Sequence, residues 1–205
     1  MHSRRELARA LSAVSDFDQP IASLEQYLTS PELASHVCHV AEMAGDVSDR
    51  TVVDLGTGTG MLAIGARFGG PDRIVGIDVD AGALSTAVEN ERRIFADRSI
   101  EWIRADATRP PLSISGVTVF SNPPFGAQNA SSHADRAFLV AIADIASVSY
   151  TIHNEGSRSF VESFADDVGA SLTHAFAAEI PVGRRFDFHT EDRRDLPVEV
   201  YRIEW

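Results

Sequence analysis

An Asn-Pro-Pro-Phe motif, Asn122 to Phe125, follows directly on the short apolar stretch Val117 to Phe120. Two successive prolines hold the chain extended and remove two amide donors, which leaves carbonyl oxygens free to accept hydrogen bonds. An aromatic amine is a poor nucleophile because its lone pair is delocalised into the ring. The Asn122 side-chain oxygen and the Pro123 carbonyl can accept its two hydrogens, and Phe125 can stack on an extruded base. The motif predicts an amine-binding site, and the alternative is a rigid proline turn; the catalytic candidates are Asn122, Pro123, Pro124 and Phe125.

A glycine-rich turn, Gly56 to Gly60, follows the apolar stretch Thr51 to Leu55 and leads into a helical pattern from about Met61. Such a turn lets backbone amides approach a cofactor at a helix N-terminus. Its spacing is G-x-G-x-G, whereas G-x-G-x-x-G is the spacing that places a pyrophosphate on the helix. S-adenosylmethionine has no phosphate, so the turn favours this cofactor over a nicotinamide dinucleotide, whose enzymes share the layout. The alternative is a tight turn without a ligand.

Two acidic residues are expected at the same edge of the sheet as this turn. Asp78 ends the next predicted strand, Arg73 to Asp78, where a carboxylate can accept both ribose hydroxyls of a cofactor. Asp106 follows the third predicted strand, Ile100 to Ala105, and could accept from the adenine amine of the cofactor. On its own, Asp106 is no more informative than any aspartate in a loop.

Strand and helix patterns alternate along the chain, which predicts a doubly wound, Rossmann-like α/β fold. The remaining predicted strands are Val117 to Phe120, Val148 to Ile152, Leu172 to Ile180 and Val198 to Trp205, and the last two resemble a terminal antiparallel pair. Residues 1–49 form an N-terminal helical extension, in which Ser30 is the expected N-cap of a helix that begins at Pro31. No domain boundary is evident, so residues 1–205 are expected to form one domain.

Composition limits the class of protein. At 205 residues, 44% of them hydrophobic, the chain suits one globular α/β domain. No apolar run approaches the ~18 residues of a membrane span, and the N-terminus lacks the apolar core of a signal peptide. Cys38 is the only cysteine, so we expect neither a disulfide nor a cysteine-ligated zinc, and no metal site. We expect a cytoplasmic protein without a membrane partner.

The charge is distinctive, since the formal net charge is −12 and all 18 basic residues are arginine. A lysine-free acidic surface suits a salt-rich cytoplasm, where screening lengths shrink to a few ångströms and self-repulsion costs little. We therefore expect a protein from a halophile; the alternative is chance in a GC-rich genome. Outside that context, such a charge would argue against a nucleic-acid partner.

Several motifs in a fixed order resemble one family. They are Gln26-Tyr27-x-Thr29, Asp54-Leu55-Gly56-x-Gly58-x-Gly60, Asp78-x-Asp80, Asn122-Pro123-Pro124-Phe125-Gly126 and Asp135-x-x-Phe138-Leu139. From about Leu24 to the C-terminus, the chain is similar to the methyltransferase-like family that makes N6-methyladenosine in small-subunit ribosomal RNA of archaea and eukaryotes. The resemblance implies a class I methyltransferase fold, with a seven-stranded, mostly parallel sheet. The glycine turn is general to such enzymes, and the Gln-Tyr-x-Thr and Asp135 motifs narrow the resemblance to this family.

The resemblance also implies roles for single residues. Asn122 to Phe125 would hold the target adenine. The extension of residues 1–49 would contribute to the S-adenosylmethionine site. The implied cofactor-binding residues are Gln26, Thr29, Asp54, Gly56, Gly58, Thr59, Met61, Asp78, Asp106 and Ala107.

Two kinds of partner follow from the resemblance. The first is an RNA substrate, although family members carry lysines near the C-terminal hairpin where this chain has Arg184, Arg185, Arg193 and Arg194, interspersed with acidic residues. The second is a small zinc-binding activator protein that adds a strand to the apolar edge strand 99–104, because exposed edges usually avoid such composition. The alternative is that the N-terminal helix covers this edge.

Other functions remain open at this point. The same Asn-Pro-Pro box occurs in enzymes that methylate the N2 amine of guanine in ribosomal RNA, and in enzymes that methylate the glutamine amide of release factors. The release-factor enzymes usually carry a preceding helical bundle and a tyrosine after the prolines, and this chain has neither. A binding subunit that has lost catalysis is a further possibility, against which the intact Asn122 to Phe125 motif argues.

Overall fold

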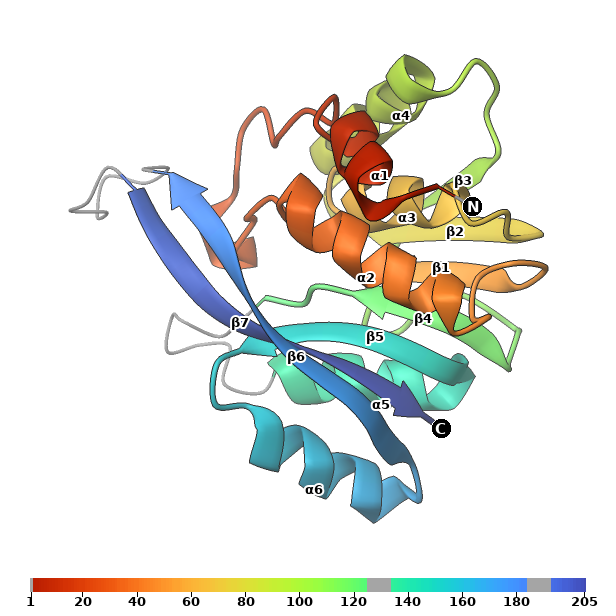
Figure 1. Ribbon diagram of the computed structural model, residues 1–205, viewed down its shortest axis with the longest axis vertical. Coiled ribbons are helices and arrows are strands. Elements are labelled where there is room, and N and C mark those ends of the chain that lie inside the picture. Colours follow the sequence, from red (N-terminus) through yellow and green to blue (C-terminus); the bar gives the residue numbers. More distant parts are fainter. Residues whose placement is uncertain (1, 125–133, 184–192) are drawn as a thin grey trace.

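A seven-stranded sheet forms the centre of the computed structural model, which describes residues 2–124, 134–183 and 193–205 (Figure 1). The strand order is β3-β2-β1-β4-β5-β7-β6. Strands β1 to β5 pair in parallel, and β7 runs antiparallel to β5 and β6. The predicted parallel sheet with a C-terminal antiparallel pair is confirmed. The strands are β1 (Thr51–Leu55), β2 (Arg73–Asp78), β3 (Ile100–Arg104), β4 (Val117–Ser121), β5 (Ala146–Asn154), β6 (Ser171–Gly183) and β7 (Arg193–Glu204).

Helices cover both faces of this sheet (Figure 1). On one face, α1, α2 and α3 pack on β1, β4 and β5, and α4 lies beside β2 and β3. On the other face, α5 packs on β1, β2 and β4, and α6 lies against β7. Val52 and Val53 of β1 therefore lie in different cores, as expected for a parallel strand buried on both sides. The helices are α1 (Arg4–Leu11), the 3₁₀ turn η1 (Ala22–Leu24), α2 (Pro31–Met43), α3 (Met61–Arg67), α4 (Ala81–Ile94), α5 (Ala134–Ile145) and α6 (Arg158–Val168).

The N-terminal extension contains α1, η1 and α2. Helix α1 begins with a capping box in which Ser3 and Glu6 bond each other's backbone amides. The Ser30 hydroxyl accepts from the amide of Leu33, and Pro31 is the first residue of α2, as predicted. Helix α1 packs on α2 and α3, so it lies with the helical layer rather than taking the place of a partner at β3.

Strand boundaries differ from the prediction mainly at the C-terminus. The expected strands, Leu172 to Ile180 and Val198 to Trp205, left out Pro181 and Pro197, and proline lacks the amide that a sheet ladder uses. In the structure β6 and β7 continue past both prolines, pairing from Ser171 with Glu204 to Gly183 with Arg193. Each proline lies within the two-stranded part of this hairpin. None of the helices in the described part of the chain has both the length and the apolar character that a bilayer span requires.

Candidate active site

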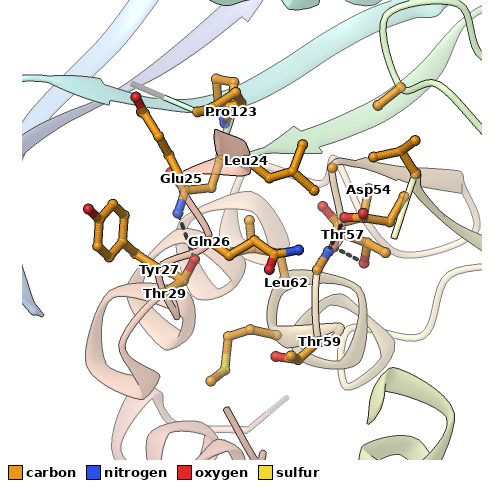
Figure 2. A pocket seen from close by; sticks show the side chains of 18 of the residues that line it. Leu24, Glu25, Gln26, Tyr27, Thr29, Asp54, Thr57, Thr59, Leu62 and Pro123 are labelled. Carbon is orange, nitrogen blue, oxygen red and sulfur yellow. Dashed lines mark hydrogen bonds between the residues drawn. The ribbon is translucent and has the colours of Figure 1, made fainter. Parts of the chain in front are cut away.

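A cavity of about 370 Å³ lies at the carboxyl ends of the parallel strands. The N-terminal extension forms one wall, from Phe17 and the segment Leu24 to Thr29, and the loops after the strands form the other. Figure 2 shows Leu24, Glu25 and Gln26 of the first wall together with Asp54 and Thr57 of the second. All ten expected cofactor-binding residues line this one cavity, together with Asn122, Pro123 and Pro124. Phe125 and the hairpin arginines 184 and 185 lie outside the described residues. The structure thus brings together motifs that are separated by nearly 100 residues in the sequence.

At two positions of the glycine turn, a side chain would collide with a ring at the cavity. Gly56, Gly58 and Gly60 all have positive φ, a conformation that favours glycine. A Cβ on Gly58 would lie 2.8 Å from the Phe17 ring, and one on Gly56 would lie 3.2 Å from the Phe138 ring. At these two positions the turn therefore presents its backbone, and not a side chain, to the cavity.

Asp54, the last residue but one of β1, lies beneath this turn and is almost fully buried. One carboxylate oxygen accepts from the Thr57 hydroxyl at 2.7 Å and from the Ala63 amide at 3.0 Å. Among the described residues, the other oxygen has no hydrogen-bond partner. Burial raises the pKa of Asp54 to about 7, against the opposing effect of the two hydrogen bonds. A positively charged ligand in the cavity would therefore favour the ionised form of Asp54.

Asp78 ends β2 and joins the glycine turn to α4. Its two oxygens accept from the Gly58 amide at 2.8 Å and the Asp80 amide at 2.9 Å. Asp80 caps α4 through Gly82 and also accepts from the Gln26 side-chain amide at 2.8 Å. Burial raises the pKa of Asp78 above its usual range, and the two backbone hydrogen bonds oppose the shift. A chain of hydrogen bonds therefore links the N-terminal extension to the carboxylate expected at a ribose.

The charges around the cavity are of one sign. Glu25, Asp54, Asp78 and Asp106 line it, whereas no arginine or histidine is among its lining residues in the described part of the chain. Two hydrogen bonds from Thr108 lower the pKa of Asp106 and keep it ionised. Such a site repels phosphates and attracts cations. It fits S-adenosylmethionine, which carries a sulfonium and an ammonium group, better than it fits a phosphate-bearing dinucleotide.

Asn122 follows β4 on the side of the cavity away from Asp78. Its amide nitrogen donates to the Thr29 hydroxyl at 2.9 Å. Its amide oxygen is buried and has no hydrogen-bond partner among the described residues. A buried carbonyl oxygen without a donor is unfavourable, so it marks a place where a ligand donor can bind. This oxygen, beside Pro123, is available to accept a hydrogen bond from a ligand.

Several residues of the cavity were not predicted. Glu25 is buried with a φ of 48°, a strained value for a residue other than glycine. Its position beside Gln26 was the one available signal. Phe17 lies in an irregular segment, which Asn90 holds by accepting from the Ser15 amide and donating to the Ser15 carbonyl. Local pattern carries no information about such long-range placement. The other unpredicted lining residues are Leu24, Tyr27, Leu28, Thr57, Leu62, Val79 and Phe138.

Comparison with known proteins agrees with this architecture. A family model for ribosomal protein L11 methyltransferase matches residues 36–108, which include the glycine turn and Asp78 but not Asn122. An uncharacterised protein of Methanocaldococcus jannaschii, MJ0284, is 34% identical over the whole chain and 95% of its own length. The rRNA N(6)-adenosine-methyltransferase Mettl5 of Drosophila melanogaster is 29% identical over 98% of this chain and 95% of its own.

A solved structure gives the same result. A protein of Pyrococcus horikoshii, PH1948, provisionally identified as an RNA methyltransferase, superposes with a TM-score of 0.89. It is 33% identical and covers 100% of this chain and 98% of its own. Together with the anionic cavity, these relatives identify the cofactor as S-adenosylmethionine. The chain belongs to the family of these archaeal proteins and is an S-adenosylmethionine-dependent RNA methyltransferase.

Proposed function

We propose that this protein methylates the N6 amine of an adenosine in structured ribosomal RNA, and that the RNA is that of the small subunit. The observation that carries the proposal is the buried, unpartnered amide oxygen of Asn122 next to Pro123, in the same cavity as the anionic cofactor residues. The full-length similarity to rRNA N6-adenosine methyltransferases of animals supports the choice of adenine N6.

The cofactor half of the cavity would be formed by the residues that line it after β1, β2 and β3. Asp78 would accept from the ribose hydroxyls, and Asp106 with Ala107 would contact the adenine. Gly56, Gly58, Thr59 and Met61 form the turn against which the methionine part would lie, with Asp54 beneath and Gln26 and Thr29 across the cavity. S-adenosylmethionine supplies an electrophilic methyl group on a positively charged sulfur.

The target half would hold the amine by its hydrogens. The Asn122 oxygen accepts one N–H and the Pro123 carbonyl accepts the other, which favours a pyramidal nitrogen whose lone pair faces the cofactor half. Pro124 keeps the segment extended, so the two acceptors stay at a fixed spacing. No general base is needed before transfer, because the amine becomes strongly acidic only once it is methylated, and its extra proton would then pass to water. Phe125 would stack on the extruded base.

The direct test uses purified protein, tritium-labelled S-adenosylmethionine and separated ribosomal RNAs from cells that lack the enzyme. After transfer, the RNA is digested to nucleosides and the labelled product is identified by chromatography. We expect label in N6-methyladenosine of small-subunit RNA, and none with Asn122→Ala. Label in N2-methylguanosine, or in a release factor added in parallel but not in RNA, would refute the proposal and favour one of the two alternatives.

We further propose that a small zinc-binding partner pairs with β3. In the described residues β3 pairs with β2 alone and lies at the edge of the sheet. Buried Glu91 holds the strand in place, since it accepts from the amides of Ser99 and Ile100 and from the Trp102 indole. An ordered, open edge with half-buried Trp102 and Ile103 is suited to strand addition.

The structure sharpens the test of this partner. The Ala105 amide donates to the Asp78 carbonyl, so alternation directs the Ile103 amide toward β2 and the Arg104 amide toward the open side. We expect Ile103→Pro to unfold the protein, and Arg104→Pro to leave it folded but unable to bind its partner, with Arg104→Ala as the control for the side chain. A monomeric enzyme with full single-turnover activity and no partner would contradict the proposal.

A further inference from the structure

The link between Thr29 and Asn122 joins two rigid parts of the molecule. Thr29 immediately precedes Ser30, the N-cap of α2, and its side chain is buried against the cavity. Asn122 immediately follows Ser121, whose hydroxyl donates to the Leu55 carbonyl at 2.8 Å and fixes the end of β4 beside β1. The hydrogen bond between the Asn122 amide nitrogen and the Thr29 oxygen, at 2.9 Å, spans 93 residues of sequence.

In this bond the amide nitrogen lies toward Thr29, so the amide oxygen is the end that is left for a ligand. An asparagine side chain has a donor end and an acceptor end that are nearly equal in shape. With the nitrogen bonded to Thr29, the oxygen is the unpartnered atom. In the reversed rotamer the amide nitrogen would face the target amine, and two donors would oppose each other. Only the arrangement found in the structure presents an acceptor.

We propose that Thr29 is a positioning residue for catalysis, because its hydroxyl holds the Asn122 side-chain amide in place at the cavity wall, where the amide oxygen can accept from the target amine. This role is separate from any contact that Thr29 makes with the cofactor, and it rests on the proposed function of Asn122. The N-terminal extension would then serve both halves of the site, with Gln26 acting through Asp80 and Thr29 acting through Asn122.

The test compares Thr29→Val, which keeps the shape without the hydroxyl, with Thr29→Ser, which keeps the hydroxyl. At saturating cofactor and RNA, we expect the single-turnover rate of Thr29→Val to fall about 10- to 100-fold, the cost of a misplaced reacting group. Thr29→Ser should stay near the wild-type rate. Thr118→Val is the matched control, since Thr118 is a buried threonine at the opposite end of the sheet whose hydroxyl donates to the Asp46 carbonyl. It should leave the rate unchanged.

A second readout does not depend on any RNA. In a ¹⁵N-correlation NMR spectrum, the side-chain amide pair of Asn122 is assigned from its loss in Asn122→Ala. We expect this pair to be protected from exchange in the wild type and in Thr29→Ser, and to shift and exchange faster in Thr29→Val. If Thr29→Val does not fold, Thr29→Ala carries the same expectation.

The outcomes separate this inference from the proposed function. An unchanged Asn122 amide pair in Thr29→Val, or a loss of activity that saturating cofactor restores, would overturn the positioning role. If the wild type methylates no RNA adenosine, the proposed function fails, while the NMR comparison still decides whether Thr29 orients Asn122. A rate loss in Thr29→Val that saturating cofactor does not restore, with an altered amide pair and rescue by serine, supports the inference.

Discussion

The two ends of the parallel sheet treat buried acids in opposite ways. At the amino end, the Asp46 carboxylate accepts from the Arg202 guanidinium through both of its oxygens, at 2.8 and 3.2 Å, and from the Tyr150 hydroxyl at 2.6 Å. At the carboxyl end, Asp54 and Asp78 accept from neutral donors, and no ion pair to either is found in the described residues. We call the amino end the closed end, because Arg202 neutralises its carboxylate. We call the carboxyl end the open end, because no cationic side chain pairs with Asp54 or Asp78 in the described residues.

This difference indicates that the Asp46–Arg202 end contributes to stability and that the Asp54 and Asp78 end is suited to ligand binding. A paired, hydrogen-bonded charge ties α2 and its following loop to β7 and needs nothing further. Buried carboxylates without a cation raise the free energy of the empty protein, as the raised pKa values of Asp54 and Asp78 indicate. Proteins retain such an unfavourable free energy at sites where the binding of a ligand offsets it. The five predictions below test this contrast.

The largest expected effect on stability is at the closed end. Asp46→Ala leaves the Arg202 guanidinium, which is about nine-tenths buried, without its bidentate partner. We expect the free energy of unfolding to fall by about 3–5 kcal/mol, the usual cost of breaking a buried pair. Denaturant unfolding measures it, and cofactor affinity in the remaining folded protein should be unchanged. A loss of cofactor binding without destabilisation would reverse the contrast.

At the open end, the largest effect is on chemistry. Asn122→Ala removes the acceptor for the target amine, so transfer should fall by about 100-fold or more, as when a donor or acceptor of a transition state is lost. Cofactor affinity should stay within a few-fold, because the side chain faces the amine, and thermal stability should change little. Rapid-quench assays with calorimetry separate these quantities. Retained turnover would eliminate the proposed role of Asn122.

Asp78→Ala should weaken S-adenosylmethionine binding by about 1–3 kcal/mol, the range for lost hydrogen bonds to a charged group. Unlike Asp46→Ala, it removes a carboxylate that has no cationic partner in the described residues, so the empty protein should lose less stability than with Asp46→Ala, although the Gly58 and Asp80 amides lose their acceptor. Titration calorimetry and thermal melting test the two halves of this statement. Unchanged affinity would remove Asp78 from the site.

Cofactor binding should also depend on pH through Asp54. Its folded pKa of about 7 lies above the ordinary 3.8, so its protonated form stabilises the fold at low pH, and this contribution is lost as pH rises through about 7. A cation favours the carboxylate, so we expect affinity to rise between about pH 6 and 8 and binding to release protons. Calorimetry in two buffers of different ionisation enthalpy measures the release. Asp54→Asn should abolish it, and equal heats for the wild type in both buffers would exclude the coupling.

The smallest effect concerns the surface as a whole. Because a net charge of −12 without lysine repels itself, stability and activity should rise with potassium chloride toward molar concentrations. The Asp46–Arg202 pair is buried and should be screened little, so Asp46→Ala should keep the same salt slope. A melting temperature that falls steadily with salt would contradict adaptation to a saline interior.

Sequence reasoning predicted the parts of the fold that follow a local rule. The turn Gly56 to Gly60, the strand Thr51–Leu55 and the Ser30 cap all depend on neighbours in sequence, and each lies where expected. Asn122 lines the cavity, as the chemistry of its motif predicted, and its catalytic role stays a prediction. The hydrogen bond between its amide and Thr29 was not predictable, because it spans 93 residues and the resemblance linked Thr29 only to the cofactor. Phe17 was missed for the same reason, since the segment before it is held by hydrogen bonds between Asn90 and Ser15, 75 residues apart.

The intrinsic fluorescence of Trp102 can report on ligand binding. Its ring would meet a Cβ on Gly76 at 2.5 Å and one on Gly60 at 2.7 Å, so the indole covers the end of the glycine turn from the edge strand. The one other tryptophan, Trp205, contacts Phe164 on the far side of the sheet and bonds Ser149. In a Trp205→Phe protein, the emission of a single indole reports on both the turn and the open edge. Fluorescence titration can therefore follow occupancy of either without a label.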